Sequence, residues 1–234
     1  MTQTPSQIID AIVQAAETAQ SATLQDFVCA ASTYVMNSAA LSSSDKKRHQ
    51  IALSRVLGHA LKTDLVAANS RMTNIQVGEI NVYGALRKGQ ADLVEFHGGD
   101  GIRFAAELKP VNLAVGRAIW NRFGDIRMFA VNVHIKFPFS VLAGILTVPT
   151  IEIDNGVAKS TVHLIDRLIK RLAQAGSRDN ETGGAHLLEG IAVVAYDPQT
   201  QTILPASPQP TSVLRWENCV QRLASLYDSR FGED

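Results

Sequence analysis

Apolar residues recur every three to four positions in the first third of the chain, which is the spacing of one face of an α-helix. A first helix, with Ser6 as a candidate N-cap, carries apolar side chains at Ile8, Ile9, Ile12, Val13 and Ala16. A second helix begins near Thr23, and a third runs from Lys46 to about Val66 after the polar loop 42–45. Residues 1–72 are therefore predicted to form an N-terminal helical region packed on the remainder of the chain.

Apolar runs with the spacing of β-strands replace this pattern after residue 72. Strands are predicted at Thr73–Tyr83, in both arms of a hairpin within 90–110, and at Met128–Ile135, Phe139–Val148 and Leu187–Tyr196. Helices are predicted at Asn112–Phe123, Ser160–Ala175 and Ser212–Ser229, and a second hairpin turns at Asn155-Gly156. Together these elements predict an α/β fold in which residues 73–234 form the core and the whole chain is one continuous domain.

The hairpin within 90–110 brings charged side chains together. Its turn is the glycine-rich segment 97–101, and a symmetric fold-back gives the cross-strand pairs Phe96–Arg103, Val94–Ala105 and Asp92–Glu107. Because side chains alternate along a strand, Glu107 and Lys109 share one face, which we expect to carry chemistry. The other face is expected to be core, with Leu93, Ile102, Phe104, Ala106 and Leu108.

Two carboxylates that face each other across a strand pair need a compensating charge. At about 5 Å and an effective dielectric of roughly 20, two unit negative charges repel by about 3 kcal/mol. Lys109 offsets part of this repulsion, and a divalent cation between Asp92 and Glu107 would offset more. Hard oxygen ligands favour Mg²⁺, with Mn²⁺ as an alternative, over zinc. The competing interpretation is a charged cluster that only solvates a sheet edge.

Asp92 followed across a turn by Glu107-Leu108-Lys109 resembles the motif of the PD-(D/E)xK nuclease superfamily, which includes most type II restriction endonucleases and many repair and phage-defence nucleases. The first acid matches Asp92, the second matches Glu107, and the lysine matches Lys109. Ala91 stands where the pattern has proline, which is its weakest position. The resemblance covers residues from about 79 to 149.

This resemblance implies a restriction-endonuclease-like mixed β-sheet core flanked by helices, built in the order helix, three strands, helix, strand. It implies that Asp92, Glu107 and the backbone carbonyl of Leu108 hold the metal. It also implies that Lys109 orients the attacking water or stabilises charge on the phosphate. Glu79 is the natural candidate for the additional upstream acid that often joins such sites.

The charge composition restricts how nucleic acid could be bound. The chain has 22 Lys and Arg against 22 Asp and Glu, so it has no overall basic field. Any DNA-binding surface must be local, and basic residues do flank the hairpin. The candidates for DNA contact are Arg87, Lys88, Arg103, Arg117 and Arg122, each of which also has an ordinary interpretation as a solvated charge.

Other features of the sequence indicate the cellular compartment and argue against other kinds of catalytic site. Two cysteines, Cys29 and Cys219, lie far apart in helical patterns, which is typical of a reduced cytoplasmic protein and not of a disulfide scaffold or zinc site. No export signal is predicted, and the apolar segment 137–149 is too short to span a membrane. No phosphate-binding GxxxxGK[ST] motif and no HExxH motif occurs.

The sequence thus predicts a metal-dependent DNA endonuclease that hydrolyses phosphodiester bonds. The expected form is a type II restriction enzyme that acts as a homodimer on a short, symmetric site in double-stranded DNA, with a cognate DNA methyltransferase acting on the same site as a candidate partner. Two alternatives stay open: a repair or phage-defence nuclease with the same site, and a DNA-binding module that does not cut.

Overall fold

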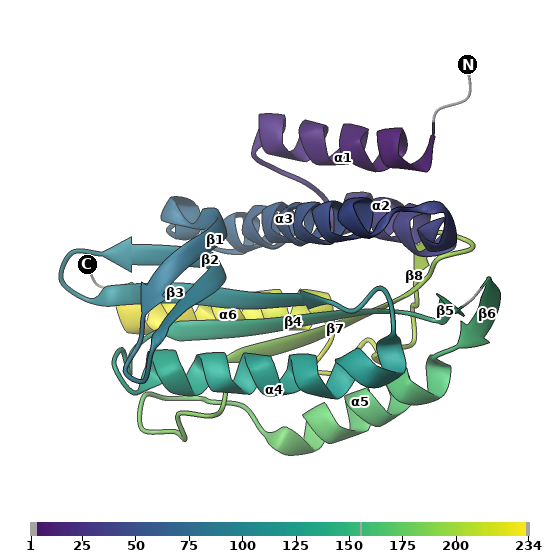
Figure 1. Cartoon of the computed structure of the whole chain (residues 1–234). Helices are drawn as coiled ribbons and strands as arrows, with labels where there is room; N and C mark the ends of the chain where they lie inside the picture. The colour runs from purple at the N-terminus through teal and green to yellow at the C-terminus, as the bar shows by residue number, and fades with distance from the viewer. Residues whose placement is uncertain (1–3, 155, 233–234) are drawn as a thin grey trace.

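A six-stranded mixed sheet forms the middle layer of the computed structural model, which describes residues 4–154 and 156–232 (Figure 1). The strand order is β1-β2-β3-β4-β7-β8, and the strands are β1 (Gln76–Tyr83), β2 (Lys88–His97), β3 (Gly101–Pro110), β4 (Val141–Pro149), β7 (Gly190–Asp197) and β8 (Thr202–Ile203). The first three strands form an antiparallel meander, β3, β4 and β7 are parallel, and β8 is antiparallel to β7. The structure is therefore an α/β protein, as predicted.

Helices cover both faces of the sheet. One face packs on α2 (Leu24–Met36), α3 (Ser43–Ala68) and α6 (Trp216–Phe231), and the other on α4 (Val115–His134) and α5 (Val162–Ala175). Two short 3-10 helices, η1 (Ser38–Ala40) and η2 (Met72–Asn74), and a small hairpin of β5 (Ile151–Asp154) and β6 (Val157–Ser160) complete the described elements. The Asn155 of the predicted turn lies outside the described residues.

The N-terminal helices begin at side-chain caps. Thr4, not Ser6, caps α1 (Pro5–Ala19), because Pro5 suits the first helical position and Gln7 completes a capping box. Thr23 caps α2 through Asp26, and Ser42 caps α3. The outermost helix, α1, packs on α2 and α3 and not directly on the sheet (Figure 1).

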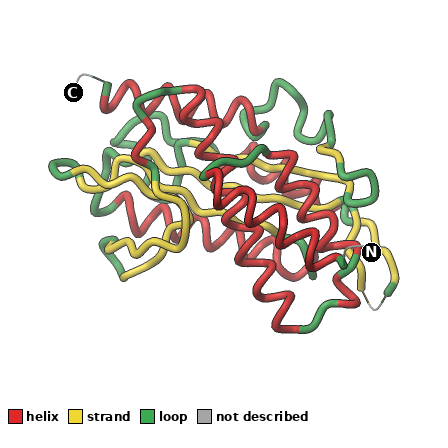
Figure 2. The backbone as a smooth tube through the Cα atoms, turned by 90° about the horizontal axis from the view of Figure 1, so that it is seen from above, coloured by secondary structure: helices red, strands yellow, loops and turns green. Residues whose placement is uncertain are grey.

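A β-bulge gives the hairpin a different register from the predicted one. Val94 pairs with Ala105 as expected, but Phe96 pairs with Ile102, because Arg103 is an extra residue in β3. The extra residue moves the side chain of Ile102 to the α4 side of the sheet, away from Leu93. Both faces of the sheet are covered by helices (Figure 1 and Figure 2), so the face that was expected to carry chemistry also contributes to a core.

Residues 128–134 are helical, so the predicted strand at 128–135 was wrong. They form the last seven residues of α4, which is 20 residues long and ends before Ile135. Ile126, Phe129, Ala130 and Val133 follow helical spacing and are buried against the sheet. Over this short span the apolar residues fit both the two-residue period of a strand and the 3.6-residue period of a helix. Packing on the sheet favours the helix.

The remaining predicted elements match the structure with shifted ends. The strand at 139–148 is β4, the strand at 187–196 is β7, and the final helix is α6. Among the described residues, no helix has the length and apolar character needed to span a bilayer.

Candidate functional site

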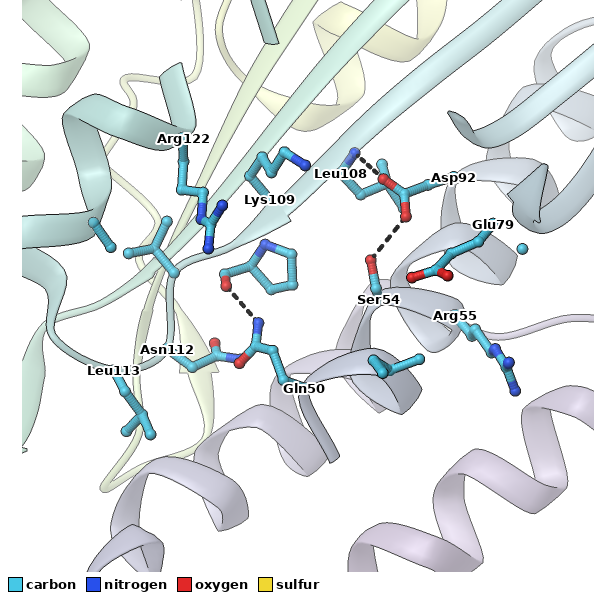
Figure 3. A pocket seen from close by; sticks show the side chains of 15 residues that line it. Gln50, Ser54, Arg55, Glu79, Asp92, Leu108, Lys109, Asn112, Leu113 and Arg122 are labelled. Atoms are coloured by element: carbon cyan, nitrogen blue, oxygen red, sulfur yellow. Dashed lines mark hydrogen bonds between the residues drawn. The ribbon is translucent and has the colours of Figure 1, made fainter. Parts of the chain in front are cut away.

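The pairing of β2 with β3 ends beside the predicted acidic pair, so the central sheet divides at this point. The β2–β3 ladder extends from His97–Gly101 to Leu93–Ala106. Beyond that point, β2 continues its pairing with β1, whereas β3 continues its pairing with β4. A cavity of about 420 Å³ occupies this division, with Asp92 on one side and Lys109 on the other (Figure 3). The sheet therefore supplies polar side chains to an open space at a point where strand pairing is interrupted.

A second bulge, in β1, faces Asp92. The β1–β2 register shifts between Val77 and Ile80, which leaves Gly78 and Glu79 opposite Asp92. Gly78 has a φ of +133°, in the region that glycine adopts without strain. Bulges of this kind redirect side chains near functional sites. Here the bulge places Glu79 in the cavity wall, with its carboxylate directed toward Asp92 and Ser54 (Figure 3).

Both carboxylate oxygens of Asp92 accept hydrogen bonds. The backbone amide of Leu108 donates to Oδ2 at 2.7 Å, and the Ser54 hydroxyl donates to Oδ1 at 3.3 Å. The Asp92 side chain thereby takes the place of a backbone carbonyl beyond the end of the β2–β3 ladder. Its position is fixed by β3 and by α3 together.

Glu107 and Lys109 form an ion pair on β3. Their side chains are only 13% and 20% exposed, respectively. Lys109 belongs to the cavity wall, whereas Glu107 lies beside Lys109 outside that wall. The sequence-predicted acids and lysine therefore gather around one division of the sheet, with Asp92 and Lys109 nearest to the open space.

Burial perturbs both acids. It raises the pKa of Glu107 to about 7; the nearby Lys109 opposes this increase, and Asp92 adds to it. Burial also raises the pKa of Asp92, against the lowering effects of the Leu108 amide, Lys109 and Ser54. Perturbed, mutually interacting acids beside a cavity are characteristic of functional sites.

The donor set is chemically suited to a hard divalent cation. Two buried carboxylates share a single ammonium group, so added positive charge would relieve their repulsion. No group of three or more His, Cys, Asp or Glu side chains positioned to hold a metal occurs in the described part of the chain. An ion here would be held by one or two carboxylates and the Leu108 carbonyl, with the balance from water and substrate oxygens, as Mg²⁺ commonly is.

The basic residues predicted to contact DNA are distributed unevenly. Arg122 lines the cavity and pairs with Asp125 at 3.0 Å. Arg117 and Lys46 line an adjoining hollow of about 780 Å³, which shares Leu113 with the first cavity. The same hollow also contains Glu152 and Asp154, so the basic side chains near the opening are interspersed with acidic ones.

Three other predicted basic residues lie elsewhere. Arg87 is in the β1–β2 turn, where its amide donates to Asn132 near the end of α4, and Lys88 is the first residue of β2. Arg103 was predicted on the site face, and this was wrong. Because of the bulge, its guanidinium lies on the α6 side, 2.6 Å from Asp100 and 5.0 Å from the ring centre of Phe231.

Sequence reasoning missed the contribution of α3. Gln50, Ser54 and Arg55 of this helix line the cavity. Gln50 donates to the Pro110 carbonyl at 2.7 Å, and Arg55 pairs with Glu17 of α1 at 3.1 Å. Gln50 and Ser54 are four residues apart and so share one side of the helix, but the sequence gives no signal of the partners that they meet there.

Comparisons with protein-family models, with curated proteins and with solved structures found no match. The functional interpretation therefore depends on the geometry and chemistry of the cavity.

Proposed function

We propose that this protein is a metal-dependent nuclease that hydrolyses phosphodiester bonds in DNA. The observation that carries the proposal is the placement of Asp92 and Lys109 in the wall of one cavity, with Glu107 paired to Lys109. The order of elements supports it. An antiparallel β1-β2-β3 meander followed by the α4 crossover and the parallel strand β4 agrees with the order that the PD-(D/E)xK resemblance implies.

In the proposed mechanism, Asp92, Glu107 and the Leu108 carbonyl would hold Mg²⁺ or Mn²⁺. When bound, the metal supplies a water of lowered pKa and neutralises phosphate charge. Lys109 is the group on β3 that can orient the attacking water or stabilise negative charge on the phosphate. Glu79, from the β1 bulge, is placed to contact water or metal on the far side of Asp92.

The proposed reaction is attack of water on phosphorus with cleavage of the P–O3′ bond. The products are a 5′-phosphate and a 3′-hydroxyl, and the leaving oxygen takes up a proton. The neutral overall charge means that DNA would be held by local cations; Arg55 and Arg122 line the cavity, and Arg117 and Lys46 line the adjoining hollow. A homodimer acting on a symmetric duplex site, with a methyltransferase that protects the same site, is the form of the proposal closest to type II restriction.

The decisive test is incubation of the purified protein with unmethylated plasmid and phage DNA in Mg²⁺ and, separately, in EDTA. We expect cleavage that requires the metal and is abolished by Lys109→Ala. Lys170→Ala, which removes an exposed lysine of α5, should leave cleavage intact. Discrete fragments support restriction, whereas cleavage only of branched, damaged or modified DNA supports a repair or defence nuclease. DNA binding without cleavage in any condition would refute the nuclease proposal.

A further inference from the structure

Helix α3 contacts both strands that carry the proposed catalytic groups. Gln50 and Ser54 are four residues apart, so their side chains lie one above the other on the helix. Ser54 donates to Asp92 of β2, and Gln50 donates to the carbonyl of Pro110, which directly follows Lys109 in β3. We propose that Ser54 and Gln50 are positioning residues for the nuclease site, with Ser54 orienting the metal-binding carboxylate and Gln50 fixing the strand that carries Lys109. This inference rests on the proposed function.

Ser54 restricts the carboxylate of Asp92. The Leu108 amide holds one oxygen, and without a second donor the carboxylate plane is free to turn about that bond. The Ser54 hydroxyl engages the other oxygen and fixes the plane. Each carboxylate oxygen retains a further lone pair, so both contacts leave room for a cation. Hydrogen bonds to metal-binding carboxylates of this kind typically contribute 10–100-fold to metal affinity or activity.

Gln50 belongs to a series of contacts that holds β3 where it leaves the sheet. The Pro110 carbonyl accepts from Gln50, the Val111 amide donates to the Thr147 carbonyl at 2.9 Å, and the Asn112 side chain accepts from Tyr196 at 2.9 Å. Three consecutive residues after Lys109 are thus fixed from three different elements. Loss of the Gln50 contact would loosen the backbone next to Lys109 and leave Asp92 in place.

Helix α3 is anchored by buried side chains, so it can hold Gln50 and Ser54 in fixed positions. It is 26 residues long, and its buried side chains include Leu53, Val56, Leu57 and Leu61. At Gly58, one further turn along the same side, a Cβ would lie 2.8 Å from Val77. The helix therefore packs closely on the Val77 side chain of β1, and catalytic groups held from rigid elements are held accurately.

The two contacts make separable predictions. Removal of the Ser54 hydroxyl should weaken divalent-cation binding about 10-fold in the absence of DNA. Removal of the Gln50 amide should lower kcat more than metal affinity, because its contact is with Pro110, next to Lys109, whereas Ser54 contacts the metal-binding carboxylate of Asp92 itself. A residue with a merely structural role would lower stability without this division of effects.

The test is calorimetric titration of Mn²⁺ into the protein without DNA, followed by cleavage kinetics. Ser54→Ala and Ser54→Val should bind Mn²⁺ about 10-fold more weakly, and Ser54→Thr, which restores the hydroxyl with nearly the shape of valine, should recover most of the affinity. Ser43→Ala, an exposed serine at the start of the same helix, serves as the control. Comparison of Mn²⁺ affinity between Ser54→Thr and Ser54→Val isolates the effect of the hydroxyl, because both variants impose nearly the same steric change. This comparison remains valid even where Ser54→Ala folds poorly.

The outcomes separate this inference from the proposed function. Mn²⁺ affinities within twofold for Ser54→Thr and Ser54→Val would overturn the role of Ser54 while leaving a metal-dependent nuclease intact. A Gln50→Ala variant that weakens metal binding as much as Ser54→Val would overturn the division of roles. Absence of Mn²⁺ binding and of cleavage in the unaltered protein would overturn both proposals.

Discussion

The amide of Leu108 donates a 2.7 Å hydrogen bond to the carboxylate of Asp92, in a place where a regular antiparallel ladder would have a backbone carbonyl. This contact joins the two halves of the divided sheet through a side chain. It also couples the orientation of Asp92 to the strand that carries Glu107 and Lys109. The hydrogen bond therefore holds Asp92 against β3 where the sheet divides.

Replacement of Asp92 by asparagine tests the central acid. The amide keeps the size of the carboxylate but loses its charge and presents an NH₂ group to one of its two donors, Leu108 or Ser54. We expect DNA cleavage to fall by at least about 100-fold and Mn²⁺ affinity to fall with it. Asp166→Asn, at an exposed position of α5, should retain both properties. Undiminished cleavage by Asp92→Asn would exclude Asp92 from the chemistry.

The raised pKa of Glu107 predicts a loss of stability with rising pH. The folded protein retains this proton up to about pH 7, whereas the unfolded chain releases it near pH 4.5. The stabilising contribution is therefore complete below pH 4.5 and is lost as pH rises to about 7. Glu107→Gln removes the effect, so its free energy of unfolding should fall less across this range, by up to about 3 kcal/mol.

Urea denaturation at pH values on both sides of this range measures the difference. Glu181→Gln, an exposed glutamate, provides the control and should follow the unaltered protein. Parallel pH profiles for Glu107→Gln and the unaltered protein would show that the Glu107 carboxyl is not perturbed. Under the proposed function, Mg²⁺ added above pH 7 should restore stability to the unaltered protein and have less effect on Glu107→Gln.

A buried charge cluster around Glu189 predicts a large loss of stability on mutation. Glu189 is fully buried and contacts Arg178 at 3.0 Å, Arg230 at 2.9 Å and His134 at 3.2 Å. Glu189→Gln would leave two buried guanidinium groups without their carboxylate. We expect about 3–5 kcal/mol of destabilisation in chemical denaturation, since removal of one partner of a buried ion pair leaves an uncompensated charge. A loss below about 1 kcal/mol would mean that water replaces the carboxylate.

Gly144 in β4 sets how closely α4 approaches the sheet. A Cβ at this position would lie 2.5 Å from Cγ2 of Ile126. Gly144→Ala should therefore destabilise the protein by about 1–3 kcal/mol through overpacking. Ile126→Ala in the same chain should recover part of that loss in a double-mutant cycle. Gly98→Ala, where a Cβ meets nothing within 4 Å, should be nearly neutral. Additive effects at Gly144 and Ile126 would contradict the contact.

The sequence predicted those features that depend on local pattern. The hairpin turn, the three N-terminal helices and the position of Asp92 opposite the strand of Glu107 and Lys109 follow from glycines, capping residues and strand alternation. These patterns involve residues only a few positions apart, so they can be recognised without knowledge of tertiary contacts. The class of fold and the membership of the acidic cluster were accordingly accessible from the chain alone.

The features that escaped prediction depend on contacts between distant segments. The extra residue at Arg103 is stabilised by Asp100 and by Phe231 of the last helix, and no local pattern encodes it. Residues 128–134 are helical because their apolar side faces the sheet. Ser54 meets Asp92 across 38 positions of sequence, and a single serine in a helix carries no signal of that contact.

Helices cover both faces of the sheet, and Asp92 borders the cavity at its division. The opening is bordered by α3 on one side, with Gln50 and Ser54, and by α4 on the other, with Ala118 and Arg122. Under the proposed function, a polynucleotide would enter edgewise between these two helices and not lie flat across the strands. The two helices would then set the orientation of the bound polymer, while the strands beneath supply the reactive groups.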